Sequence, residues 1–248
     1  MTNPRVFLNK NEENDILQGF PWVFDNEIAF VKAMSGEKGE QIEQTSLAEC
    51  KVKDGTLVEV YTKGGLCLGS GILNKKSKIC IRLLTNKATP QGVQFFNKQY
   101  FANLIEQALQ MRLYTFSFED SFRLIFGEAD FIPGLIVERY FDITGKIFLV
   151  VQFLTLGVEV FRLSILQALE EICKPTGIYE RSDANVRLLE GLELRNGWLS
   201  EEFEPIITIK ENGVKLKVDL AKGQKTGYFL DQKQNRQIAA NYAKNAKV

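Results

Sequence analysis

"TLVEVYTKGGLCLGSGILNKKSKICIRLL" (56–84) contains three β-prone runs in succession. The runs cover 56–61, 66–74 and 78–84, and each is short and rich in branched apolar residues. A Gly64-Gly65 pair separates the first two runs, and a lysine-rich loop separates the last two. Because spacing of this kind is typical of small barrels and sandwiches, we expect a compact β-domain in this part of the chain.

The flanking segments extend this prediction in both directions. The stretch 5–24 predicts a strand and then a short helix that ends at Gly19 and Pro21. The segment 34–50 is polar and dotted with glycine, so we expect a loop with one weak strand. "NKATPQGV" (86–93) is polar, and the residue pattern changes after it. We therefore interpret it as a linker.

The middle of the chain mixes helical and strand patterns. Apolar residues recur at helical spacing in 95–114 and in 157–173, and the second of these predicted helices ends before Pro175. Strand-like runs cover 121–126, 134–141, 146–154 and 177–182. This alternation predicts an α+β layer.

The last part of the chain begins with a hairpin signal in "PIITIKENGVKLKVDL" (205–220), where Asn212-Gly213 separates two alternating runs. The polar stretch "KGQKTGYFLDQKQNRQ" (222–237) follows. A helix is predicted from about Asp231 to Ala246, with Asp231 as its N-cap.

Composition narrows the classes of function. The chain has 248 residues, of which 45% are hydrophobic and 25% charged, as is typical of a soluble globular protein. The net charge of the chain is zero. The segment 210–248 nevertheless contains nine Lys or Arg and only three acidic residues, which favours an anionic partner for this end. There is no histidine, so a Ser-His-Asp site is excluded and the commonest metal ligand is missing.

The cysteines and the apolar runs give three further expectations. Cys50, Cys67, Cys80 and Cys173 show no C-x-x-C spacing, so we expect neither a zinc site nor a disulfide framework. No signal-peptide core and no run of 18 apolar residues is found. We therefore expect a cytoplasmic protein that has no membrane partner.

Four polar motifs have two interpretations each. The Lys225-Thr226 pair is not a nucleotide phosphate loop, because Gln224 stands where that loop needs glycine. It is either a plain turn into the helix or a loop that faces a ligand at the helix N-terminus. Glu128 and Asp130 could act as a general acid and base. The simpler interpretation is that they are solvated side chains in a turn before Pro133-Gly134.

The other two motifs concern phosphate contacts. The stretch 180–191 carries Arg181, Asp183, Arg187 and Glu190. Either Ser182 or Asp183 caps a short helix there, or the two arginines bind phosphates. The stretch 74–82 is either a solvated hairpin tip or an RNA-backbone contact, and its basic residues are Lys75, Lys76, Lys78 and Arg82.

Five stretches, taken together and in this order, resemble one family. They are "FPWVFDNEI" (20–28), "GSGILNKKSKICIRLLT" (69–85), "GEADFIPGLIVERY" (127–140), "IYERSDANVRLLEGL" (178–192) and "GQKTGYFLDQKQNR" (223–236). The chain resembles the S-adenosylmethionine-dependent large-subunit ribosomal RNA cytosine-5 methyltransferases with an N-terminal PUA domain. The resemblance covers nearly the whole chain.

The resemblance implies a fold and a reaction. Residues 1–86 would form a PUA-like RNA-binding β-barrel and 95–204 an α+β middle domain, while 205–248 would be the lead-in hairpin and helix of a doubly wound α/β methyltransferase domain. The reaction in rRNA processing would move a methyl group from S-adenosylmethionine to C5 of a cytosine in 23S ribosomal RNA. The resemblance also allows a homodimer.

The resemblance implies candidate site residues as well. Thr226, Phe229 and Gln232 would touch the cofactor. The full cofactor-binding set would be Lys225, Thr226, Gly227, Phe229, Asp231, Gln232 and Arg236. The RNA-binding set would be Trp22, Lys75, Lys76, Lys78, Arg82, Arg181, Asp183 and Arg187. Phe20 stands where the family usually has histidine, and Lys233 replaces an arginine, which loses a bidentate fork.

The resemblance places the glycine-rich cofactor turn and the nucleophilic cysteine beyond Val248. "NYAKNAKV" (241–248) would be the approach to the first strand of the methyltransferase domain. We therefore expect a fragment that is inactive by itself and that holds no catalytic residue and no metal. A stand-alone RNA-binding module is the main alternative, and an enzyme of another class built on Glu128 and Asp130 is the second.

Overall fold

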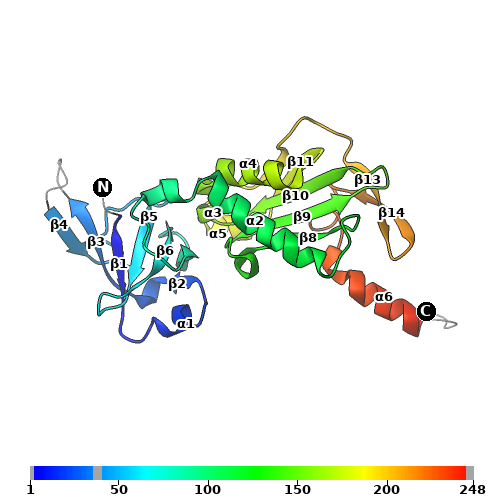
Figure 1. The fold of residues 1–248 in the computed structure, drawn as a ribbon. Coiled ribbons are helices and arrows are strands. Elements are labelled where there is room, and N and C mark those ends of the chain that lie inside the picture. Colours follow the sequence, from blue (N-terminus) through cyan, green and yellow to red (C-terminus); the bar gives the residue numbers. More distant parts are fainter. Residues whose placement is uncertain (1–2, 36–40, 244–248) are drawn as a thin grey trace.

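The computed structural model describes residues 3–35 and 41–243, and Figure 1 shows two bodies joined by the segment that follows β7. The first body is a seven-stranded sheet in the order β2-β7-β6-β5-β1-β3-β4. Only the β1–β5 pair is parallel within it. Its strands are β1 (Arg5–Leu8), β2 (Trp22–Phe24), β3 (Ile28–Ser35), β4 (Gln41–Thr45), β5 (Leu57–Tyr61), β6 (Cys67–Leu73) and β7 (Ile79–Thr85).

The N-terminal predictions agree with this sheet. The short helix is α1 (Asn14–Leu17), which ends before Gly19 as expected, and a 3-10 turn η1 (Asp25–Glu27) follows β2. The weak strand expected in 34–50 is β4, although residues 36–40 of that segment lie outside the described residues. Buried valines such as Val6, Val58 and Val60 give this body its own apolar core.

The expected linker 86–93 is fastened to the first body. Thr89 is fully buried, and the Asn3 side chain donates to its carbonyl oxygen at 2.9 Å. The Ser70 hydroxyl donates to the Lys87 carbonyl at 2.7 Å. A 3-10 turn η2 (Gly92–Phe95) then leads into the second body.

The second body is built on a five-stranded sheet in the order β12-β11-β10-β9-β8, in which only β10 and β11 are parallel. Its strands are β8 (Phe122–Phe126), β9 (Leu135–Phe141), β10 (Ile147–Phe153), β11 (Gly177–Ser182) and β12 (Arg195–Trp198). β12 was not predicted, because "RNGW" has little β-propensity.

Helices cover one face of this sheet. They are α2 (Lys98–Leu113), α3 (Leu156–Val160) and α4 (Arg162–Cys173), and the short α5 (Val186–Leu189) follows β11. The helix expected over 157–173 is interrupted at Phe161, which separates α3 from α4. A 3-10 turn η3 (Gly127–Asp130) follows β8.

Strand alternation decides what packs on each face of the five-stranded sheet. Leu149 and Val151 on β10 belong to the core under the helices, whereas Phe148 and Val150 belong to the core under the hairpin. The hairpin consists of β13 (Ile206–Glu211) and β14 (Val214–Asp219). Asn212 and Gly213 have φ of 49° and 85°, as the predicted two-residue turn requires.

The chain then passes through the 3-10 turn η4 (Leu230–Gln232) into α6 (Lys233–Tyr242), which extends away from the body in Figure 1. The predicted start of this helix was wrong. Asp231 lies in η4 and does not cap α6, whose N-cap position is Gln232. The predicted end, and most of the segment 241–248, lie outside the described residues. In the part of the chain described here, no helix has the length and apolar character needed to span a membrane.

Candidate functional site

The polar loop between β14 and η4 has a backbone that few residue types allow. Lys225 and Gly227 have φ of 55° and 116°. A Cβ on Gly227 would lie 3.1 Å from the Tyr140 hydroxyl, so the loop approaches β9 closely only because residue 227 is glycine. The Gly227 amide donates to the Gln224 carbonyl at 3.0 Å and closes a tight turn around Lys225 and Thr226.

Buried hydrogen bonds hold this loop on β9. The Tyr140 hydroxyl donates to the Thr226 carbonyl at 3.0 Å and accepts from the Tyr228 amide at 3.1 Å. The Thr226 hydroxyl donates to Glu138 Oε1 at 3.2 Å. Tyr140 and Thr226 are 0% and 2% exposed, so these bonds are shielded from water. Thr226 therefore anchors the loop, and its expected contact with the cofactor stays a prediction.

Glu138 is the charged group beneath the loop. Its Oε1 also accepts from Arg123 Nε at 2.9 Å, while its Oε2 is buried and has no hydrogen-bond partner among the described residues. Burial raises the pKa of Glu138, and the Arg123 charge opposes that rise. Thus one carboxylate oxygen is satisfied and the other is not.

The remaining residues of the predicted cofactor-binding set divide into two groups. Arg236 is occupied, because its Nε and Nη2 donate to the two Glu211 carboxylate oxygens at 2.6 and 2.9 Å. Lys225 is exposed, and its Nζ lies 4.1 Å from the centroid of the Phe229 ring and 3.7 Å from Asp231 Oδ2. Lys225 and Asp231 are thus exposed on this side of the loop, and Phe229 and Gln232 beside them are half-buried.

A second predicted cluster, the basic turn between β6 and β7, stays at the surface. Lys75, Lys76 and Lys78 are all exposed. Lys75 Nζ donates to the Cys50 carbonyl at 3.0 Å, and the Lys75 amide donates to Asp54 Oδ1 at 2.8 Å. This turn therefore offers three cations in a fixed backbone frame.

Two other residues of the predicted RNA-binding set lie between the two bodies. Arg82 Nη1 donates to Glu190 Oε1 at 2.8 Å, and Trp22 Nε1 donates to Glu128 Oε1 at 2.8 Å. The Arg82 guanidinium lies 5.9 Å from the Trp22 ring centroid. Both side chains make contacts within the protein that local sequence patterns did not reveal.

The carboxylates considered for acid/base chemistry are also engaged. Glu128 accepts from Trp22, and Asp130 Oδ2 accepts from Arg112 Nη2 and from the Phe126 amide, both at 2.6 Å. Each acid thus has a structural partner of its own. No group of three or more acidic or cysteine side chains within residues 3–35 and 41–243 is arranged to hold a metal ion.

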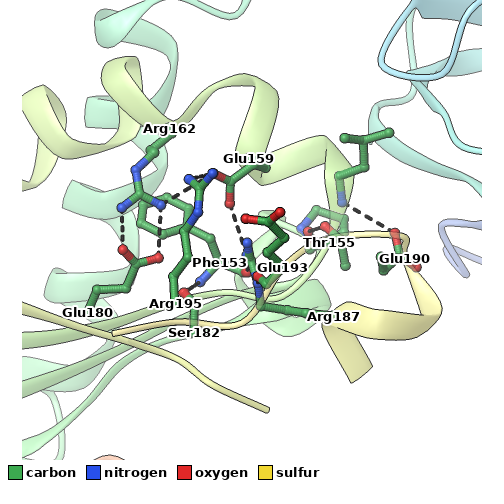
Figure 2. Close-up of polar contacts among 12 residues, drawn as sticks. Phe153, Thr155, Glu159, Arg162, Glu180, Ser182, Arg187, Glu190, Glu193 and Arg195 are labelled. Carbon is green, nitrogen blue, oxygen red and sulfur yellow. Dashed lines mark hydrogen bonds and ion pairs between the residues drawn. The ribbon is translucent and has the colours of Figure 1, made fainter. Parts of the chain in front are cut away.

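Arg187 belongs to a buried ion network (Figure 2). It is 1% exposed, and its guanidinium donates to the Glu193 carbonyl at 2.8 Å and to Glu159 Oε2 at 2.9 Å. Glu159 also accepts from Arg195 Nη1 at 2.9 Å. Arg187 therefore acts inside the fold rather than at a surface.

Glu180 forms the other end of that network. Burial would raise the pKa of Glu180, but hydrogen bonds from Arg162 and Ser182 more than offset it and hold the pKa below its usual value. Arg162 contacts both carboxylate oxygens of Glu180. The Arg162–Glu180 pair connects α4 to β11 at the first residue of the predicted phosphate-binding stretch.

Arg181 and Asp183 connect that stretch to the polar loop. Arg181 Nε donates to Asp183 Oδ2 at 3.3 Å, and its Nη1 donates to the Gly223 carbonyl at 3.1 Å. Asp183 and Arg181 are both half-buried. Two of the predicted sites, which lie far apart in the sequence, are thus in direct contact.

The cysteine thiols are not arranged as nucleophiles. Burial raises the pKa of Cys80 and the pKa of Cys173 to about 12. Cys50 is buried, and Cys67 Sγ lies 3.9 Å from the Gly69 carbonyl. The two thiols with raised pKa are protonated near neutral pH.

Comparison with known proteins places the first body in a class. Residues 6–86 match the family of PUA-like domains, so the seven-stranded sheet is a PUA-like domain. Over 247 residues the chain is 34% identical to "Ribosomal RNA large subunit methyltransferase I" of Tolumonas auensis. It is 36% identical to the protein of the same name from Photobacterium profundum.

The overlap with these relatives is one-sided. Each match covers 98% of this chain and 56% of the relative, so the chain spans about half the length of the curated relatives it matches. The fold resembles a candidate S-adenosylmethionine-dependent methyltransferase from Streptococcus mutans, with a TM-score of 0.69, 20% identity, and coverage of 96% of this chain and 54% of that one. Another candidate methyltransferase, solved with S-adenosylhomocysteine, also has a TM-score of 0.69, at 21% identity and with coverage of 97% and 54%.

Proposed function

We propose that these residues are the RNA-binding part of an S-adenosylmethionine-dependent ribosomal RNA methyltransferase that methylates C5 of a cytosine in 23S ribosomal RNA. The observation that carries this proposal is the match along 98% of the chain to large-subunit ribosomal RNA methyltransferases at 34% identity. The PUA-like domain and its exposed basic turn supply a surface of the right charge.

RNA binding tests the proposal directly. The wild-type chain should bind deproteinised large-subunit ribosomal RNA with a strong dependence on salt. Replacing Lys75, Lys76 and Lys78 together by Ala should reduce the slope of log K against log salt by about two to three, because each phosphate contact contributes about 0.7–0.9. Replacing Lys10, Lys63 and Lys146 by Ala is the matched control, since these are also exposed lysines and lie elsewhere. An unchanged slope in the first variant would contradict the proposed surface.

The polar loop is proposed as one wall of the cofactor site. Lys225, Phe229, Asp231 and Gln232 would face the cofactor, with the Phe229 ring as the apolar contact. Thr226 and Arg236 would hold the loop in place, which fits their buried bonds to Glu138 and Glu211. Bound S-adenosylmethionine would supply the methyl group, and these residues would only orient it.

We further propose that the 248 residues alone transfer no methyl group. The support is the placement of the thiols. Cys50, Cys80 and Cys173 are buried, whereas attack on C6 requires an accessible thiolate, and burial raises the pKa of Cys80 and of Cys173 to about 12. A methyl-transfer assay with labelled S-adenosylmethionine and large-subunit ribosomal RNA should give no labelled RNA. Turnover by the purified chain would overturn this part of the proposal.

A stand-alone RNA-binding module remains the second candidate, favoured by the PUA-like domain alone. The two candidates differ in the polar loop. If the loop is a cofactor wall, S-adenosylmethionine should slow hydrogen exchange in 223–236 of this chain, and Phe229→Ala should weaken that effect and leave RNA affinity unchanged. A pure module predicts no effect of the cofactor on any property of the chain.

A further inference from the structure

The junction between the two bodies centres on Glu190. This residue as a whole is 3% exposed. Its Oε1 accepts from Arg82 Nη1 at 2.8 Å, and its Oε2 accepts from Asn74 Nδ2 at 3.0 Å and from the Leu156 amide at 3.3 Å. Asn74 Nδ2 also donates to the Glu190 carbonyl at 3.0 Å. Two of these three donor residues come from the PUA-like domain and one from the second body.

The backbone around Glu190 is shaped to fit the basic turn. Gly191 has φ of +70°, and a Cβ there would lie 2.4 Å from Lys76 Cδ. The methylene groups of Lys76 thus pass directly over the chain of the second body, while its residue as a whole stays exposed. The basic turn and the segment after α5 are therefore neighbours on one surface.

Apolar and aromatic contacts close the rest of the junction. Leu57, Ile72 and Leu84 of the PUA-like domain belong to the same apolar core as the helices and strands of the second body. The Tyr100 hydroxyl donates to the Leu84 carbonyl at 2.5 Å, and Trp22 is bonded to Glu128. These contacts are apolar or half-buried, whereas the Glu190 carboxylate is a buried charge whose side chain is 2% exposed.

A buried carboxylate restricts the junction more than an apolar contact does. Apolar contacts are non-directional, whereas a buried charge that loses its donors is strongly destabilising. The donors Arg82, Asn74 and the Leu156 amide are satisfied together in one relative orientation of the two bodies. A hinge motion would expose or orphan the Glu190 carboxylate.

We propose that Glu190 is a positioning residue that locks the PUA-like domain in one orientation and so holds the exposed lysines of the basic turn in a fixed position against the second body for RNA binding. This inference rests on the proposed RNA-binding function. It assigns Arg82 and Trp22 to the junction rather than to RNA. A preformed surface avoids the entropic cost of aligning two mobile domains when RNA binds.

Solution scattering of the whole chain tests the lock. Glu190→Ala should increase the radius of gyration and split thermal unfolding into two transitions, one for each body. Glu202→Ala is the matched control, because Glu202 is exposed and has no hydrogen-bond partner among the described residues. A Glu190→Ala protein with wild-type scattering and a single transition would overturn the proposal.

Two further variants keep the test informative if Glu190→Ala does not fold. Arg82→Met removes the charged donor on the other side of the junction. The Arg82 side chain is 13% exposed, and its replacement should increase the radius of gyration, as Glu190→Ala should. Glu190→Gln keeps an acceptor for Arg82 or Asn74, so it should restore the compact scattering in part. A compact Arg82→Met protein would contradict the lock.

RNA affinity separates this inference from the function on which it rests. With deproteinised large-subunit ribosomal RNA, Glu190→Ala should bind about tenfold more weakly than wild type and Glu190→Gln should recover part of that loss. If wild type does not bind this RNA, the proposed function fails, whatever the scattering shows. If wild type binds and an expanded Glu190→Ala protein binds equally well, the lock has no role in recognition and the inference fails.

Discussion

Glu190 and Glu138 are both buried glutamates, yet they stabilise their regions in different ways. Both oxygens of Glu190 have donors, which come from two domains. Glu138 has donors on one oxygen only, and burial raises its pKa. The first carboxylate joins two bodies, and the second supports one loop on one strand.

The difference shows how the surroundings of a buried acid set its role. A fully bonded carboxylate fixes geometry, since any displacement breaks several charge-assisted bonds at once. A carboxylate with donors on one oxygen only becomes protonated at a higher pH. Burial disfavours its charged form, and the missing hydrogen bonds do not offset that penalty. We therefore expect the loop anchor to respond to changes in pH.

The largest expected effect comes from removing the junction carboxylate. Glu190→Ala should lower the free energy of the first unfolding transition by about 3–5 kcal/mol, because it leaves buried donors without an acceptor. Urea denaturation followed by fluorescence measures this change, with Glu202→Ala expected within about 0.5 kcal/mol of wild type. Equal losses in both variants would mean that the Glu190 carboxylate does not stabilise the junction in the way described.

A smaller effect is expected at the loop anchor. Tyr140→Phe removes one hydroxyl that bonds both the Thr226 carbonyl and the Tyr228 amide, so it should cost about 1–3 kcal/mol. Hydrogen exchange at the Tyr228 amide should accelerate, while exchange around Glu190 should not change. Unaltered protection of Tyr228 would show that other contacts hold the loop.

The smallest effect is a pH dependence. Because the pKa of Glu138 in the folded protein lies above its ordinary value of 4.5, the folded state holds this proton more tightly than the unfolded state. Its contribution to stability is complete below that ordinary value and is lost as the pH rises through the raised pKa. Glu138→Gln should remove this part of the pH profile, whereas Glu202→Gln should not. A wild-type profile in the Glu138→Gln protein would contradict the raised pKa.

Local sequence signals predicted local structure well. The Asn212-Gly213 turn and the strands on either side of it follow from residue type and alternation, and the structure confirms them. The helix start at Asp231 was wrong, because a 3-10 turn intervenes before Lys233. The preference of Asp for N-cap positions does not by itself distinguish the start of a 3-10 turn from the start of an α-helix.

Long-range pairing was the part that the sequence could not reveal. Arg82 and Glu190 are 108 residues apart, and each reads as an ordinary surface charge in its own segment. Arg187 likewise appeared available for phosphate until Glu159, 28 residues earlier, was placed beside it. A buried arginine and an exposed one share the same local pattern, since burial depends on which elements meet.

Hydrogen exchange of the whole chain, with and without deproteinised large-subunit ribosomal RNA, tests most directly whether the two bodies recognise RNA as one unit. We predict that RNA slows exchange both in the β6–β7 turn, at 74–78, and in the segment 186–195, and that both effects appear over the same range of RNA concentration. Protection confined to the PUA-like domain, or absent from both segments, would contradict the account.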